Sequence, residues 1–201
     1  LLKTDVIYSL EIQCRFLEKN IEKQLLGNHL FANGKALTFA GFFFDGVEAK
    51  KWRKIGTSIL KKQVEEQVLS DGGNFELSTM YHMIFLEDLL DLINLHRAYG
   101  VKEPIGIEER IEPMFSWLEA MCHPDGEISF FNDAALDITP SVEEIHDYGQ
   151  KLGLIADFVF ELKKGKIQYY LVSRSNPLIP GTSRWRLSIS QIIDKQPGSI
   201  S

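Results

Sequence analysis

Two short polar segments hold the side chains of this sequence that are best suited to chemistry. The first contains Asn28 and His29, and the second contains Glu76 and Tyr81. Asn28 offers a neutral amide that can hydrogen-bond a carboxylate, and His29 can accept or donate a proton near neutral pH. Tyr81 can exchange a proton where neighbouring donors lower its pKa, and Glu76 can orient an imidazole or share a proton with an acid group.

One reaction needs an amide, an imidazole and a phenol together, namely β-elimination on a uronic acid. The carboxylate must be neutralised, a base must remove the proton from C5, and an acid must protonate the leaving glycosidic oxygen. A glycosidase that pairs the carboxylates of Glu76 and Asp125 is an alternative. Each group also has a structural interpretation: the amide as a helix cap, the histidines as half-buried helix residues and the phenol as a core aromatic.

The elements that must position these groups are helices, because apolar residues recur at helical spacing over most of the first 152 residues. The pattern predicts helices at residues 4–26, 28–44, 47–69, 78–99, 106–121 and 141–152. Gly27 is expected to end the first helix and Asn28 to cap the second. Ser78 is expected to cap the fourth, and Ser141 the sixth in a capping box with Glu144.

Short connections make consecutive helices antiparallel, so their ends alternate between two sides of the bundle. On this count residue 27, the loop at residues 71–76 and the loop at residues 123–133 all lie at one end. The turn at residues 45–46 and the connection at residues 99–106 lie at the other. We therefore expect the three polar-aromatic segments to converge on one ligand.

The composition excludes several classes of protein. The 201 residues suit one domain, or one domain and a fragment, and 44% of them are apolar, which is ample for a core. A net charge of −6 with interspersed Lys and Arg argues against nucleic-acid binding, and no apolar run is long enough to span a membrane. Cys14 and Cys122 lie far apart and predict neither a metal motif nor a disulfide framework.

The two ends of the sequence carry separate signals. The chain lacks an initiator Met and begins within a helical pattern, which predicts a piece of a larger protein, so a missing signal peptide says nothing about its compartment. Strands are predicted at residues 158–160, 167–172 and 184–189, with a hairpin turn at residues 163–166. We predict a mainly α domain over residues 1–155 and a short β-rich segment over residues 156–201.

Six short segments of the helical part carry a family resemblance. They are Gly27-Asn28-His29-Leu30, Asn33-Gly34-Lys35-Ala36-Leu37, Asp71-Gly72-Gly73, Phe75-Glu76-Leu77-Ser78 with Tyr81-His82, His123-Pro124-Asp125-Gly126 and Phe131-Asn132-Asp133-Ala134-Ala135. Together they resemble the heparinase II/III-like polysaccharide lyases over residues 10–155. The resemblance implies an incomplete α/α toroid of antiparallel helical hairpins. It also implies a following β-sandwich, of which the 156–201 segment is a remnant or the start, with the glycan bound between the two.

The resemblance also implies β-elimination of a uronate-containing polysaccharide. Asn28 matches the residue that neutralises the substrate carboxylate, Tyr81 matches the catalytic acid (or acid and base), and His29 matches a histidine used in proton abstraction or substrate binding. Substrate contacts are expected from Glu76, His82, His123, Asn132 and Asp133. No metal or cofactor is expected, the partner is an acidic polysaccharide, and the location is periplasmic or secreted.

The sequence departs from the family in one respect. Members have a further histidine supplied by the β-sandwich, whereas no residue after 157 is a histidine. We therefore expect this chain to hold half of an active site and to give weak turnover or none. The alternatives are a non-catalytic glycan-binding module on the same scaffold and a toroidal glycoside hydrolase. A structural helical-repeat protein would not need three polar-aromatic loops at one end.

Overall fold

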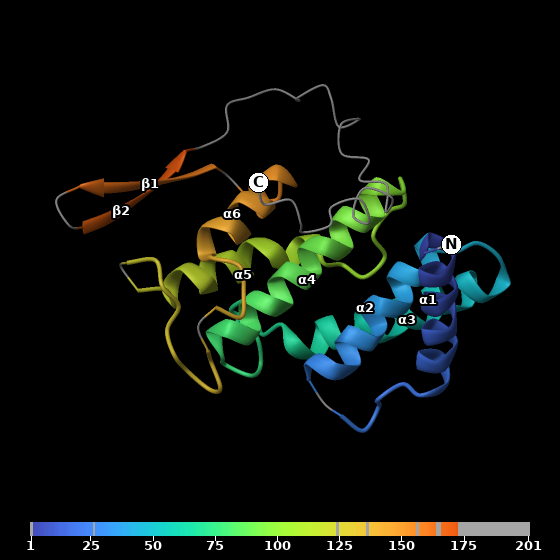
Figure 1. The fold of residues 1–201 in the computed structure, drawn as a ribbon. Helices are drawn as coiled ribbons and strands as arrows, with labels where there is room; N and C mark the ends of the chain where they lie inside the picture. The colour runs from blue at the N-terminus through green and yellow to red at the C-terminus, as the bar shows by residue number, and fades with distance from the viewer. Residues whose placement is uncertain are drawn as a thin grey trace.

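Helices make up most of the computed structural model, which describes residues 2–25, 27–123, 125–135, 137–155, 157–163 and 166–172 (Figure 1). In these residues the helices are α1 (Leu2–Lys19), α2 (Asn28–Phe43), α3 (Val47–Gln67), α4 (Thr79–Ala98), α5 (Glu108–Ala120) and α6 (Val142–Lys151). The strands β1 (Asp157–Lys163) and β2 (Lys166–Val172) pair antiparallel, with Lys163 opposite Lys166 as the predicted hairpin requires. No helix of the described part is long and apolar enough to cross a membrane.

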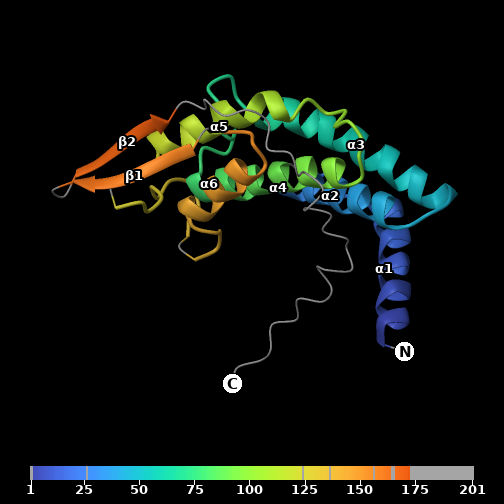
Figure 2. The same ribbon diagram turned by 90° about the horizontal axis from the view of Figure 1, so that it is seen from above.

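The helices pack in two layers (Figure 2). α2, α4 and α6 lie side by side in one layer, and α3 and α5 cover them in the other. α1 lies beyond α2, where Cys14 and Leu17 pack against a buried cluster that includes Leu37 and Trp52. The predicted mainly helical fold of antiparallel hairpins is confirmed.

α2 and α3 form a very close hairpin because glycines line their contact. A Cβ atom added at Gly41 would lie 2.5 Å from the Cβ of Arg53, and one at Gly56 would lie 2.6 Å from the carbonyl oxygen of Gly34. Only residues without a side chain allow the backbones to approach so closely. The start of α2 and the end of α3 are thereby held together at one end of the hairpin.

α4 is the central helix of the main core. Its fully buried side chains are Leu86, Leu89, Leu90, Leu92 and Ile93. They belong to one cluster with Val64 of α3, Phe115 of α5 and Ile145 of α6. Full burial of one such side chain stabilises the fold by roughly 1.5–3 kcal/mol, so the first turn of α4 rests on a rigid support.

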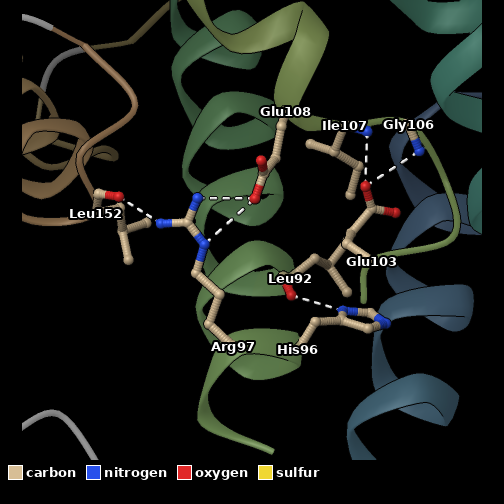
Figure 3. Close-up of polar contacts among 8 residues, drawn as sticks. All are labelled: Leu92, His96, Arg97, Glu103, Gly106, Ile107, Glu108 and Leu152. Carbon is tan, nitrogen blue, oxygen red and sulfur yellow. Dashed lines mark hydrogen bonds and ion pairs between the residues drawn. The ribbon is translucent and has the colours of Figure 1, made fainter. Parts of the chain in front are cut away.

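Glu103 closes the connection between α4 and α5, at the end of the bundle opposite residue 27 (Figure 3). Its carboxylate accepts hydrogen bonds from the backbone N–H groups of Gly106 (3.1 Å) and Ile107 (2.9 Å), and also from that of Ile105. The first N–H groups of a helix have no partner inside the helix. At α5 the N-cap residue Ile107 provides no side-chain cap, and Glu103 binds the N–H of Ile107 itself together with those of the two residues before it.

Arg97 of α4 ties three elements together at the same end (Figure 3). Its guanidinium donates two hydrogen bonds to Glu108 at the start of α5, at 2.7 and 3.2 Å, and one to the carbonyl oxygen of Leu152 just after α6. The neighbouring His96 is buried, and its Nδ1 lies 2.8 Å from the carbonyl oxygen of Leu92. This end of the bundle is built from internal contacts.

Two predictions at the start of the chain are wrong. α1 ends at Lys19 and does not continue to residue 26, because Asn33 of α2 binds Glu22. The Asn33 side chain accepts a hydrogen bond from the Glu22 backbone N–H and donates one to the Glu22 carboxylate, both at 3.0 Å. Asn28 is not the cap of α2 but its first helical residue, and the N-cap is Gly27.

The other predicted caps are confirmed. Ser78 accepts a hydrogen bond from the backbone N–H of Tyr81 at 3.4 Å, and Ser141 forms a complete capping box with Glu144. α6 ends at residue 151 and β1 begins at residue 157, while the domain boundary at residues 155–156 stays a prediction. The strand predicted at residues 184–189 lies outside the described residues.

Candidate active site where α2 and α4 begin

Three segments meet at one end of the helical layers: the turn before α2, the loop between α3 and α4, and the loop after α5. The side chain of Gln67 donates a hydrogen bond to the carbonyl oxygen of Gly27 at 3.1 Å. The side chain of Asn132 donates to the carbonyl oxygens of Glu76 (3.2 Å) and Leu77 (3.3 Å). The three segments therefore share one end of the bundle, as predicted, while their convergence on one ligand stays a prediction.

Gly27 sets the start of α2 against the loop between α3 and α4. Its φ of 77° and ψ of −140° are angles that residues with a side chain rarely adopt. A Cβ at this position would lie 2.8 Å from Oε1 of Glu76. The position of Asn28, which follows directly, is thereby tied to that loop.

Asn28 and Tyr81 carry polar groups that the described part of the protein does not use. Both side chains are partly exposed, and the Tyr81 ring packs against the main core in the first turn of α4. Within the described residues neither the Asn28 amide nor the Tyr81 hydroxyl is engaged in a hydrogen bond. Both groups can therefore bond to a bound molecule without breaking a contact of the protein.

His29 follows Asn28 and is exposed to solvent. Its side chain is 58% exposed, and its Nδ1 lies 3.9 Å from a carboxylate oxygen of Glu22. The imidazole therefore lies beside the start of α2 with access to solvent.

Glu76, Asp133 and Asn132 form a second polar group at the junction. Burial, followed by the nearby charge of Asp133, raises the pKa of Glu76. Leu77, Asn132 and Asp133 have φ values of 53°, 45° and 62°, which are uncommon for residues other than glycine. Asn and Asp adopt this conformation more readily than other side chains, so Leu77 is the strained position of the three.

His82 lies beneath this surface and does not reach it. Its side chain is fully buried, its Nδ1 accepts a hydrogen bond from the backbone N–H of Asn74 at 3.3 Å, and its Nε2 lies 3.0 Å from the carbonyl oxygen of Met114. The ring also packs on Trp117 at 4.5 Å. Burial lowers the pKa of His82 to about 4, so the neutral ring joins α4 to the loop before it and to α5.

His123 stands in a separate turn of the loop after α5. Its backbone pairs with Glu127, with the His123 N–H donating to the Glu127 carbonyl oxygen at 2.8 Å. Its side chain is exposed, and within the described residues it makes no hydrogen bond to another candidate residue. The structure thus joins Glu76, Asn132 and Asp133 to the turn before α2, and leaves His123 in a neighbouring exposed turn.

Two buried amides hold the site and were not singled out from the sequence. Asn74 is 2% exposed and accepts a hydrogen bond from the backbone N–H of Glu76 at 3.0 Å. Gln67 is 1% exposed and continues the buried stripe of Leu60 and Val64 on α3. A polar residue at an apolar position of a helical stripe is the signal that could have identified Gln67.

Lys35, the cation of the α2 segment, is engaged inside the helical layer. Its ammonium lies 2.5 Å from Asp88 and 2.7 Å from Asp91, and Asp91 also accepts a hydrogen bond from the hydroxyl of Tyr148 at 2.9 Å. Burial alone would lower the pKa of Lys35, but the two carboxylates outweigh it and raise that pKa. Lys35 therefore links α2 to α4 and is not a spare charge for a ligand.

The arrangement offers a specific combination of chemical groups. An uncharged amide, an exposed imidazole and a phenol stand at or near the starts of two neighbouring helices, with carboxylates beside them. The amide can hold an anionic oxygen, and the imidazole and phenol can move protons. This combination suits proton abstraction next to a carboxylate.

Comparison with known proteins identifies relatives of this chain. Residues 3–150 match the family model described as heparinase II/III N-terminus. The chain is 34% identical over 113 residues to a heparin-sulfate lyase of Bacteroides stercoris, covering 55% of this chain and 17% of that protein. It is 28% identical over 131 residues to a heparin-sulfate lyase of Pedobacter heparinus, covering 61% of this chain and 19% of that protein. The chain thus spans about a fifth of the length of these relatives.

Solved structures show the same fold. A heparinase III structure aligns with a TM-score of 0.61 at 27% identity, covering 75% of this chain and 24% of that one. Another heparinase III structure aligns with a TM-score of 0.63 at 24% identity, covering 76% of this chain and 24% of that one. The predicted partial α/α toroid is confirmed by this likeness. Since the family model matches well over half of its residues, the chain belongs to the heparinase II/III family.

Proposed function

We propose that this chain binds a uronate-containing polysaccharide and supplies one wall of the cleft in which the polysaccharide is cleaved by β-elimination. The observation that carries the proposal is the pair formed by the Asn28 amide and the Tyr81 hydroxyl, which have no hydrogen-bond partner among the described residues. They stand at the starts of α2 and α4, on elements that the core holds in place. Membership of the heparinase II/III family and the similarity to heparin-sulfate lyases support it.

In the proposed reaction the Asn28 amide donates a hydrogen bond to the carboxylate of the uronic acid. This bond stabilises the negative charge that develops as the C5 proton leaves. The electron pair of the C5–H bond forms a C4=C5 double bond while the glycosidic C4–O bond breaks, and the leaving oxygen takes a proton from the Tyr81 hydroxyl. The C5 proton passes to the imidazole of His29. If His29 only holds the substrate beside Asn28, a deprotonated Tyr81 takes the C5 proton and delivers it to the leaving oxygen.

Further substrate contacts are assigned to exposed groups near this pair. Glu76, Asn132 and Asp133 belong to the joined loops, and His123 lies in the neighbouring turn. His82 is not included, because its buried ring is already engaged on both nitrogens by the protein.

The test follows the ultraviolet absorbance of the unsaturated product with heparan-like, alginate-like and bacterial exopolysaccharide substrates. It uses the protein with all of its natural domains. Tyr81→Phe and Asn28→Ala are each expected to lower kcat by about a hundredfold or more, the usual size of a lost proton-transfer or charge-stabilising group. Tyr148→Phe is the matched control, because its hydroxyl is bonded to Asp91 inside the layer, and kcat should stay within about twofold of the wild type. Equal losses in the Tyr81 and Tyr148 variants contradict the proposal.

A non-catalytic glycan-binding module on the same scaffold is a second candidate, because the unengaged Asn28 amide can hold a carboxylate without any proton transfer. Binding without product, weakened by Asn28→Ala and unaffected by Tyr81→Phe, would support it. New reducing ends without ultraviolet absorbance would instead indicate a hydrolase that uses Glu76 and Asp125.

We also propose a periplasmic or secreted location, because uronate-containing polysaccharides occur outside the cytoplasm. Cell fractionation of the native host tests this assignment.

A further inference from the structure

Gln67, the last residue of α3, contacts both segments that carry the proposed catalytic groups. Its side-chain nitrogen donates hydrogen bonds to the carbonyl oxygen of Gly27 at 3.1 Å and to Oε1 of Gln63 at 2.7 Å. The backbone carbonyl oxygen of Gln67 accepts a hydrogen bond from the backbone N–H of Phe75 at 2.9 Å. One buried residue therefore fixes the turn before Asn28 and the loop before Glu76.

The Gln67 side chain is not satisfied as a polar group. It is 1% exposed, and its Oε1 has no hydrogen-bond partner among the described residues. A buried acceptor without a partner costs free energy, and an apolar side chain of the same length would avoid that cost. The amide therefore carries a cost of its own, against which stand its bonds to Gln63, on the same helix, and to Gly27, in another segment.

The bond to Gly27 acts at the position where α2 starts. The carbonyl oxygen of Gly27 accepts the hydrogen bond from Gln67, and Glu76 lies 2.8 Å from the place that a Cβ of residue 27 would occupy, so Gly27 lies between α3 and the next loop. The carbonyl carbon of Gly27 is joined directly to the backbone nitrogen of Asn28 by the peptide bond. Displacement of a catalytic group by about 1 Å can lower a rate by about a hundredfold, so this anchor controls where the Asn28 amide meets a carboxylate.

We propose that Gln67 is a positioning residue that sets the placement of Asn28 through the carbonyl group of Gly27. The role of Asn28 in this inference rests on the proposed function. The placement of Asn28 by Gln67 can be tested independently of that function. Gln67 itself touches no substrate.

The kinetic test is a double-mutant cycle with Gln67→Met and Asn28→Ala. Gln67→Met keeps the length of the side chain and removes the donor, so kcat should fall roughly tenfold or more, with little change in KM. Tm should fall as well, because the buried Oε1 of Gln63 loses its donor. In the Asn28→Ala background the same substitution should change kcat by less than about twofold, because the group being positioned is gone. An equal loss in both backgrounds, or a loss of Tm with unchanged kcat, overturns the proposal.

Gln63→Met is the matched control. It lies one turn earlier on α3 and removes the other partner of the Gln67 nitrogen, but leaves the bond to Gly27 in place. Its kcat should remain within about twofold of the wild type. A loss as large as that of Gln67→Met would mean that the whole amide cluster matters, which contradicts a role through Gly27.

A second measurement needs no turnover and so separates this inference from the proposed function. Nuclear magnetic relaxation of the backbone amides should show lower order parameters for Asn28 and His29 in Gln67→Met, and unchanged ones in Gln63→Met. If the protein eliminates no polysaccharide, or if Asn28→Ala has no effect on kcat, the proposed function fails. The order parameters still show whether Gln67 fixes the position of Asn28. Unchanged order parameters in Gln67→Met overturn the positioning role.

Discussion

At the scale of single residues, the site separates groups that the protein uses internally from groups left for a ligand. His82 and Gln67 are buried and bind the backbone of neighbouring segments, so they build the site from below. Asn28 and Tyr81 lie above them with hydrogen-bonding capacity to spare in the described structure. Residues adjacent in sequence, Tyr81 and His82, thus fall on opposite sides of this division.

The buried His82 predicts a pH dependence of stability. Its pKa is about 4 in the fold against an ordinary value of 6.5, mainly because burial disfavours the charged ring. Between these values the unfolded chain binds a proton that the folded chain does not, so the free energy of unfolding falls as the pH drops from 6.5 towards 4. The full shift corresponds to roughly 3 kcal/mol.

Chemical denaturation across this pH range measures the effect. His82→Asn should flatten the slope without removing it, because burial also lowers the pKa of His146 to about 4. The control His123→Ala removes an exposed imidazole and should leave the slope as it is. A slope in His82→Asn as steep as that of the wild type would show that His82 is not the group responsible.

Gly27 gives a prediction that separates backbone strain from crowding. Gly27→Ala combines an unfavourable φ with a contact to Glu76, whereas Gly46→Ala has a φ of 99° and nothing within 4 Å of the added Cβ. Gly46→Ala should cost about 1–3 kcal/mol of unfolding free energy, because its φ and ψ are essentially restricted to glycine, and Gly27→Ala should cost more and also weaken glycan binding. Unfolding curves and a binding titration of both variants test this, and equal costs would contradict it.

At the scale of elements, the start of α5 depends on a residue outside the helix. Glu103→Ala removes the acceptor for the N–H groups of Ile105, Gly106 and Ile107, and should lower the unfolding free energy by about 1–2 kcal/mol. Glu109→Ala is the control, since it removes a first-turn carboxylate that makes no such bond in the described structure. Denaturation of the two variants compares them, and similar losses would assign the effect to the helix dipole alone.

The arrangement of elements could largely be predicted from the sequence because it depends on periodicity and on short connections. The first residues of α4 and α6 follow from the N-caps at Ser78 and Ser141. Three polar segments lie at one end because short connections make consecutive helices antiparallel. The contacts of Asn132 with the loop at residues 74–78 show this arrangement.

The remaining details depend on contacts between segments far apart in sequence, which a local pattern does not record. α1 stops at Lys19 because Asn33 binds Glu22 eleven positions away. The apolar pattern of α4 could not show that His82 binds Met114 of α5. For Gln67, a signal was present in the sequence, but its partner at Gly27 lies forty positions away.

At the scale of the whole molecule, the two layers place the proposed catalytic groups at one end of the α2–α4–α6 layer. Substrate would therefore meet this chain from one side. We predict that the chain alone binds oligosaccharide but gives weak turnover or none, because a further histidine from another domain is expected to complete the site.

This prediction is tested by comparing product formation by the chain alone with that by the protein extended with its neighbouring coding sequence. Strong elimination by the chain alone, abolished by Tyr81→Phe, would show that no second domain is needed. Activity gained only on extension would agree with the prediction.

The glycine-lined contact of α2 and α3 also bears on the order in which the molecule folds. Contacts within this hairpin are close in sequence, and local contacts form faster than distant ones. During synthesis the hairpin can therefore assemble before α5 has been made, and it brings Gly27 and Gln67 together at that stage. The bonds of Asn132 need the loop after α5, so we expect the anchor of Asn28 to form before that loop docks.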